Sequence, residues 1–191
     1  MPDGGGPGAW VNARVHACRA RDLPGWLDDE LWRVELEPPV EEAEELLTAR
    51  RGRLLERVGA WDAAAAEDFA ALCVERAQRN AVEALLHAGL AEAADELGSA
   101  ADVQASAIRH AATDDSVALL ADIIELGRGG RPDAYGLAPE SPPASPGAIA
   151  ANLGFVVAHT IATSASDYDA AFAAERDVQS AWLDARLAFP A

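Results

Sequence analysis

Residues 141–166 read SPPASPGAIAANLGFVVAHTIATSAS and contain no charged residue, although a quarter of the chain is charged. Within this stretch, residues 148–165 form a helix-like run that is apolar or small on almost every side. Its strongly polar side chains are Asn152, His159, Thr160, Thr163 and Ser164. A helix of this kind is typical of the inside of a bundle and not of a surface. We therefore predict that it is the core helix of a mainly α fold.

Residues that typically begin or end helices predict further helices along the chain. Pro146 suits the first helical position behind Ser145 as a cap. Upstream, Asp62 can begin a long helix that Gly89 terminates. The fold class we predict is a mainly α helical bundle of about five to six helices. The predicted helices cover residues 62–87, 90–97, 101–112, 116–126, 148–165 and 168–187.

The N-terminal third carries a different pattern. Residues 11–19 and 32–37 alternate between apolar or small and polar side chains, as half-buried strands do. We expect these two strands to pair as a small N-terminal antiparallel β-hairpin. Residues 41–58 begin with acids and end with arginines, which matches a helix dipole. We therefore predict a helix there, interrupted by Gly52.

These predictions give one helical domain over residues 10–191, preceded by a flexible N-terminal tail over residues 1–9. Glycines and prolines dominate residues 127–146, and long loops of this kind are either lids or disordered segments. Both alternatives stay open. The remaining boundaries are a hairpin over 10–38, helices over 41–126, and two C-terminal helices over 147–188.

The net charge of −17 is large for 191 residues. Residues 61–191 hold 20 acids and only 7 arginines, whereas residues 1–60 hold 12 acids and 8 arginines. Such a field repels phosphate backbones and anionic lipid, so we expect neither a nucleic acid nor a membrane as partner. It favours a basic protein as partner, or it simply keeps the bundle soluble. A cytoplasmic location is expected, and a homo-oligomer is compatible with the sequence.

No metal or cofactor motif stands out. Cys18 and Cys73 are far apart and match no metal or redox spacing. Glu83 and His87 are four residues apart and can touch, but a metal site needs more ligands at defined spacing. We therefore predict no metal and no cofactor, and whether the chain is an enzyme stays open.

Polar side chains on the last two helices are the candidate site. Asn152, His159 and Thr163 share one stripe of the core helix, by helical angles of about 100° per residue. If the two helices are antiparallel, His159 lies near Glu175, with Gln179 as the second candidate partner. A buried histidine–carboxylate pair can act in acid–base chemistry or can fix the helix register. Tentative ligand-binding residues are Asn152, Thr163, Gln179, Trp182 and Arg186.

Two functions follow from these observations. The first is a non-catalytic acidic helical interaction or regulatory protein, such as an adaptor or an inhibitor of a basic partner. The alternative is a small-molecule-binding protein or enzyme with a pocket between the two C-terminal helices that uses His159 and Glu175. Nothing in the sequence supplies a nucleophile or an oxyanion site beside that pair.

Overall fold

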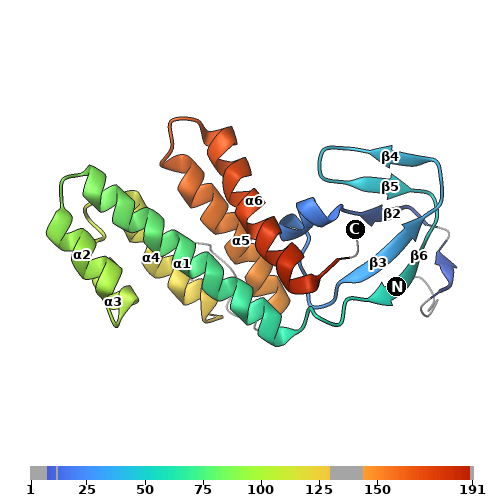
Figure 1. Cartoon of the computed structure of the whole chain (residues 1–191), viewed down its shortest axis with the longest axis horizontal. Coiled ribbons are helices and arrows are strands. Elements are labelled where there is room, and N and C mark those ends of the chain that lie inside the picture. Colours follow the sequence, from blue (N-terminus) through green and yellow to red (C-terminus); the bar gives the residue numbers. More distant parts are fainter. Residues whose placement is uncertain (1–7, 12, 130–143, 190–191) are drawn as a thin grey trace.

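The computed structural model describes residues 8–11, 13–129 and 144–189. The molecule is elongated, with a helical part at one end and a β part at the other (Figure 1). Residues 1–7 of the expected tail and residues 130–143 of the expected loop lie outside the described residues. The α-helices are α1 (Ala63–His87), α2 (Ala91–Ser99), α3 (Val103–His110), α4 (Asp115–Gly127), α5 (Pro146–Thr163) and α6 (Tyr168–Leu187).

The helices predicted after residue 60 are confirmed, and local capping explains their ends. Asp62 accepts a hydrogen bond from the backbone N–H of Ala65 at 2.9 Å, which satisfies a free donor at the start of α1. Ser145 does the same for Ala148, directly before Pro146 at the start of α5. Past the end of α1, Gly89 has a φ of +77°, a conformation that favours glycine.

Helix α1 is the centre of the helical part, and α2, α4 and α5 pack against it. Alanines at positions 66, 70, 77 and 81 of α1 are buried. At Gly154 of α5 an added Cβ would lie 3.3 Å from the ring of Phe69. These small residues bring the helices close together, and the larger core side chains fill the space around them.

The charge-free helix α5 is buried on one side only, so its expected burial on every side is wrong. Leu153, Val157 and Ala158 are inaccessible to solvent. On the opposite side Asn152 and His159 are exposed, and Phe155 keeps 56% of its surface accessible. By length and hydropathy α5 also resembles a membrane-spanning helix, as the core helix of a soluble protein can, and 44% of it is buried inside the structure.

The β part contains two three-stranded antiparallel sheets, with strand orders β1-β6-β3 and β2-β5-β4. Because β5 and β6 are separated only by Arg50 and Arg51, they act as one bent central ribbon. Strands β1 and β2 pair with one side of this ribbon, and β3 and β4 with the other. The strands are β1 (Trp10–Val11), β2 (Val15–Ala17), β3 (Trp32–Leu36), β4 (Val40–Glu42), β5 (Leu47–Ala49) and β6 (Gly52–Arg57).

Two predictions for this part are wrong. The strands expected near residues 11–19 and 32–37 exist, but they do not pair with each other, because the β5–β6 ribbon lies between them. The helix expected over residues 41–58 is instead β4, β5 and β6. Its arginines pair across strands: Arg53 Nε donates to Glu35 at 2.6 Å and Arg51 Nη1 to Glu37 at 2.9 Å. Cross-strand pairing of this kind overrides local helix propensity.

The two parts share one apolar core. The 3-10 helix η1 (Ala20–Gly25) packs against α5 and α6, and Leu23 from it is buried. Trp61 is buried just before α1, and its indole N–H donates to the Asp28 carbonyl at 2.6 Å. At Gly147 an added Cβ would lie 2.5 Å from that same carbonyl oxygen. The start of α5 therefore lies directly against the backbone that connects η1 to β3.

Candidate functional site

Glu175 of α6 is the most deeply buried acid of the candidate site, and its partner is Arg76 of α1. The Glu175 side chain is 1% exposed and that of Arg76 is 24% exposed. Arg76 Nε donates to Glu175 Oε2 at 3.0 Å, and Nη2 donates to the same oxygen at 2.5 Å. This forked, charge-assisted contact compensates the buried carboxylate. Hydrogen bonding to Glu175 raises the pKa of Arg76.

Gln179 connects this ion pair to the neighbouring helix. Its side-chain amide N–H donates to the Gly154 carbonyl of α5 at 3.0 Å, and Arg176 Nη1 donates to its oxygen at 3.1 Å. Burial lowers the pKa of Arg176, against the opposing field of nearby Glu45. The group of Arg76, Glu175, Gln179 and Arg176 thus joins α1, α5 and α6. Its polar atoms contact one another, and this arrangement suits a structural clamp better than a proton-transfer site.

His159 does not meet Glu175, so the predicted pair is wrong. The imidazole is exposed, and its Nδ1 lies 2.9 Å from the hydroxyl of Tyr168, at the start of α6. The two helices are antiparallel neighbours as expected, but α6 turns Glu175 toward α1 while α5 turns His159 outward. His159 does contact a polar group on the last helix, but that group is the Tyr168 hydroxyl and neither Glu175 nor Gln179.

An aromatic cluster surrounds His159 on the surface. We define the aromatic cluster as Phe155 and His159 of α5 with Tyr168 and Phe172 of α6. The Phe155 and His159 rings stack with centroids 6.1 Å apart, and Tyr168 and Phe172 stack at 5.9 Å. Edge contacts join the two stacks. Phe155 was missed in the sequence, although it falls on the stripe of Asn152 and His159 by helical spacing.

The other predicted ligand-binding residues do not converge on one pocket. Asn152 and Thr163 are exposed on α5, and the Thr163 hydroxyl donates to the Thr160 carbonyl. Trp182 packs against Phe69, with ring centroids 5.6 Å apart. Arg186 is exposed and forms an ion pair with Asp68 of α1 at 3.2 Å. These side chains therefore do not form a pocket between α5 and α6.

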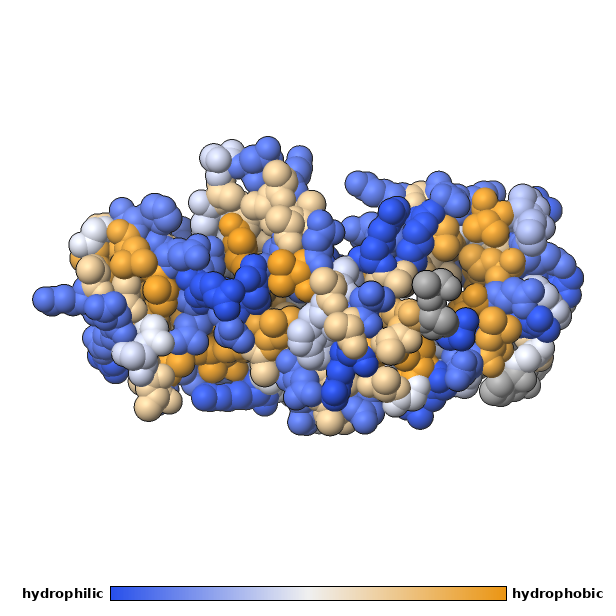
Figure 2. Space-filling model, in the orientation of Figure 1, coloured by the Kyte–Doolittle hydropathy of each residue, from blue (hydrophilic) through white to orange (hydrophobic). Residues whose placement is uncertain are grey.

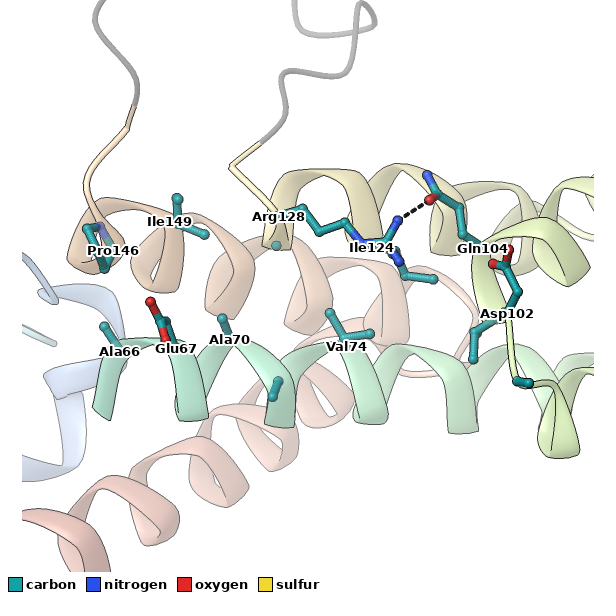
Figure 3. Close-up of a pocket in the computed structure, with 14 residues that line it drawn as sticks. Ala66, Glu67, Ala70, Val74, Asp102, Gln104, Ile124, Arg128, Pro146 and Ile149 are labelled. Atoms are coloured by element: carbon teal, nitrogen blue, oxygen red, sulfur yellow. Dashed lines mark hydrogen bonds between the residues drawn. The ribbon is translucent and has the colours of Figure 1, made fainter. Parts of the chain in front are cut away.

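A cavity of about 830 Å³ opens elsewhere, between α1, α4, α5 and the start of α3 (Figure 3). Its floor is apolar, with Ala70 and Val74 of α1, Ile124 of α4 and Ile149 of α5 pointing toward it. Polar groups stand at its rim: Glu67 on one side and Asp102, Gln104 and Arg128 on the other, where Arg128 donates to Gln104. An apolar cavity with a few polar rim groups is a common form of ligand site.

Groups that could bind metal or react as nucleophiles are sparse in the part of the chain that the structure describes. There, no three His, Cys, Asp or Glu residues gather closely enough to hold a metal ion. Cys73 is buried, and burial raises the pKa of its thiol. Cys18 is half-buried, and burial raises its thiol pKa to about 11. Since the thiolate is the nucleophile, the raised pKa disfavours the reactive form of both cysteines at neutral pH.

No protein-family model matches the chain, and comparisons with curated proteins and with solved structures also find no match.

Proposed function

We propose that the chain is a non-catalytic interaction protein that binds a basic partner through the carboxylates of its helical part. The supporting observation is that the two parts differ in how many of their charged side chains form ion pairs. Nearly all arginines of the described β part form ion pairs with glutamates of the same part or with Asp22. Residues 61–191 hold 20 acids but only 7 arginines, so within the described residues of the helical part many exposed carboxylates have no arginine at ion-pair distance.

The outer side of α6 offers the clearest surface of this kind. Asp169, Asp177 and Asp184 are all exposed, and within the described residues none has an arginine at ion-pair distance. Their spacing of eight and seven residues places them on one side of the helix over about 22 Å. Small exposed alanines lie between them at positions 173 and 181. Lysine or arginine side chains of a partner can approach such a stripe without steric hindrance.

Exposed charges such as these aspartates mainly raise the rate of association with a partner and make the binding affinity depend on salt. Binding to a basic partner should weaken steeply as salt rises above about 0.1 M, where the screening length falls to about 10 Å. The same negative field leads us to expect no binding to nucleic acid or to anionic membranes.

The test uses a fluorescent deca-arginine peptide as the probe and fluorescence anisotropy as the measurement. We expect the triple variant Asp169→Asn, Asp177→Asn, Asp184→Asn to lose about tenfold in affinity, mostly through slower association. The matched control is Glu83→Gln, Glu92→Gln, Asp95→Asn, which removes the same charge from exposed positions at the far end of the helical part. Salt-independent binding would refute an electrostatic function. Equal losses in both triple variants would refute the assignment to α6.

A second candidate function is the binding of a small amphipathic anion, and the cavity in Figure 3 supports it. Its apolar floor suits a hydrocarbon or ring body, and the Arg128 guanidinium at the rim suits an acidic group. Anilinonaphthalene sulfonate combines both features and fluoresces in apolar surroundings. We expect Val74→Trp, which fills the cavity, to abolish its fluorescence, whereas Leu86→Trp at an exposed position on the same helix should leave it unchanged.

A further inference from the structure

The exposed side of α5 carries no charged residue. Among the described helices, α5 is the one without an aspartate, glutamate or arginine. Its outward residues are Asn152, Phe155, His159 and Thr163, and Phe155 is 56% exposed. The α5–α6 hairpin projects from the body of the molecule, and apolar or weakly polar residues cover much of it in this view (Figure 2).

From this placement we propose that the exposed side of α5, with the aromatic cluster, is the contact through which two copies of this chain form a dimer. The proposal does not rest on the basic-partner function above. Its first support is electrostatic. A chain with a net charge of −17 repels a second copy wherever carboxylates face each other. The outward residues of α5 carry no charge, so a contact along this side of the helix does not itself place carboxylates of the two copies against each other.

The second support is the spacing along α5. Asn152, Phe155, His159 and Thr163 follow one another by three, four and four residues, which is the spacing of a helix–helix contact. In an antiparallel contact around a two-fold axis near residue 157, Phe155 faces His159 of the second copy. Asn152 then faces Thr163 of the second copy, so an amide can bond a hydroxyl. The stripe is therefore complementary to itself, as a two-fold interface requires.

The third support is the aromatic cluster at the edge of the stripe. Tyr168 is 40% exposed, and its stack with Phe172 holds both rings rigidly beside α5. Rigid aromatic rings lose little conformational entropy on binding and are favoured at the centres of interfaces. The cluster is small beside the about 800 Å² per partner of a standard interface, so we expect a dissociation constant in the micromolar range.

Sedimentation velocity of the full chain tests the proposal, from about 1 µM to about 100 µM, which spans the expected dissociation constant. We expect a monomer–dimer equilibrium that shifts toward dimer as salt rises, because salt screens the repulsion between two acidic chains. Binding to a basic partner has the opposite salt dependence. The failure of one proposal is therefore distinguishable from the failure of the other.

Phe155→Glu should raise the dissociation constant of the dimer by at least about 100-fold, since it places two like charges near the axis. The matched control is Ile108→Glu on α3, where the wild-type side chain is 61% exposed, and it should change the constant by less than about threefold. Asn152→Glu, at an exposed position near the start of α5, gives a second variant if Phe155→Glu fails to fold by circular dichroism. A monomer at every concentration and salt, or a dimer insensitive to both α5 variants, would overturn the proposal.

Discussion

The helical part and the β part use the same ionic side chains in opposite ways. In the β part, arginines and glutamates pair across neighbouring strands at the half-exposed surface, as Arg53 does with Glu35. In the helical part, the central ion pair of Arg76 and Glu175 is buried and joins two helices. The contribution of an ion pair to stability therefore depends on how deeply it is buried. Exposed pairs add little to stability, whereas removing one partner of a buried pair leaves a charge without compensation.

Removing one partner from each kind of ion pair tests this contrast directly. Arg76→Met removes the guanidinium and leaves the buried Glu175 carboxylate without its counter-charge, which should cost about 3–5 kcal/mol in the free energy of unfolding. The matched variant in the β part is Arg53→Met, whose ion pair is half exposed. It should cost less than about 1 kcal/mol. Urea denaturation followed by circular dichroism measures both values.

The double variant Arg76→Met, Glu175→Leu provides the control for this comparison. It removes both charges together, so it should recover a large share of the stability lost by Arg76→Met alone. Equal losses for Arg76→Met and Arg53→Met would show that burial does not separate the two pairs.

The second prediction concerns the junction between the two parts. At Gly147 an added Cβ would lie 2.4 Å from the Asp28 carbonyl carbon and 2.5 Å from the Asp29 nitrogen. Backbone atoms cannot rotate away as a side chain can, so Gly147→Ala must push α5 from the β part. We expect a loss of about 1–3 kcal/mol, measured as a lower urea midpoint.

Gly59→Ala is the control for the junction, because no atom lies within 4 Å of its added Cβ. It should leave the stability unchanged or slightly higher, since alanine restricts the unfolded chain. If Gly147→Ala were as stable as Gly59→Ala, the two parts would not be in the close contact that the structure describes.

The two parts also differ in how much the sequence alone could predict. Helix ends in the helical part were readable because capping is local: Asp62, Ser145 and Gly89 act on backbone groups within a few residues of themselves. In the β part, residues of β3 pair with residues of β6 that lie about 20 positions later in the sequence. Glutamates followed by arginines suit a helix dipole and cross-strand pairing equally well, so residues 41–58 could not be assigned from local pattern.

The candidate site shows the same limit. The predicted histidine–carboxylate pair required a buried Glu175, and Glu175 is buried, with Gln179 buried beside it. The partner of Glu175 could not be found in this way, because Arg76 lies 99 residues away on α1. His159 was misplaced since α5 carries no charged residue on any side, so helical periodicity alone does not say which side faces water. An aromatic residue beside polar ones on that stripe, Phe155, was the available hint.

The smallest expected effect concerns an exposed pair at the far end of the helical part. Hydrogen bonds from Arg109, and then from His110, lower the pKa of Glu96 on α2. A lowered pKa means that the folded state favours the ionised carboxylate. Its stabilising contribution is therefore complete above the ordinary pKa of glutamate and is lost as the pH falls through the lowered value. Because Glu96 is exposed, solvent screening should keep the effect small. A carbon-detected NMR titration should show the Glu96 carboxyl titrating below its ordinary range, and Arg109→Ala should move it back upward. An unchanged titration in Arg109→Ala would show that the contact with Arg109 does not lower the pKa of Glu96 in solution.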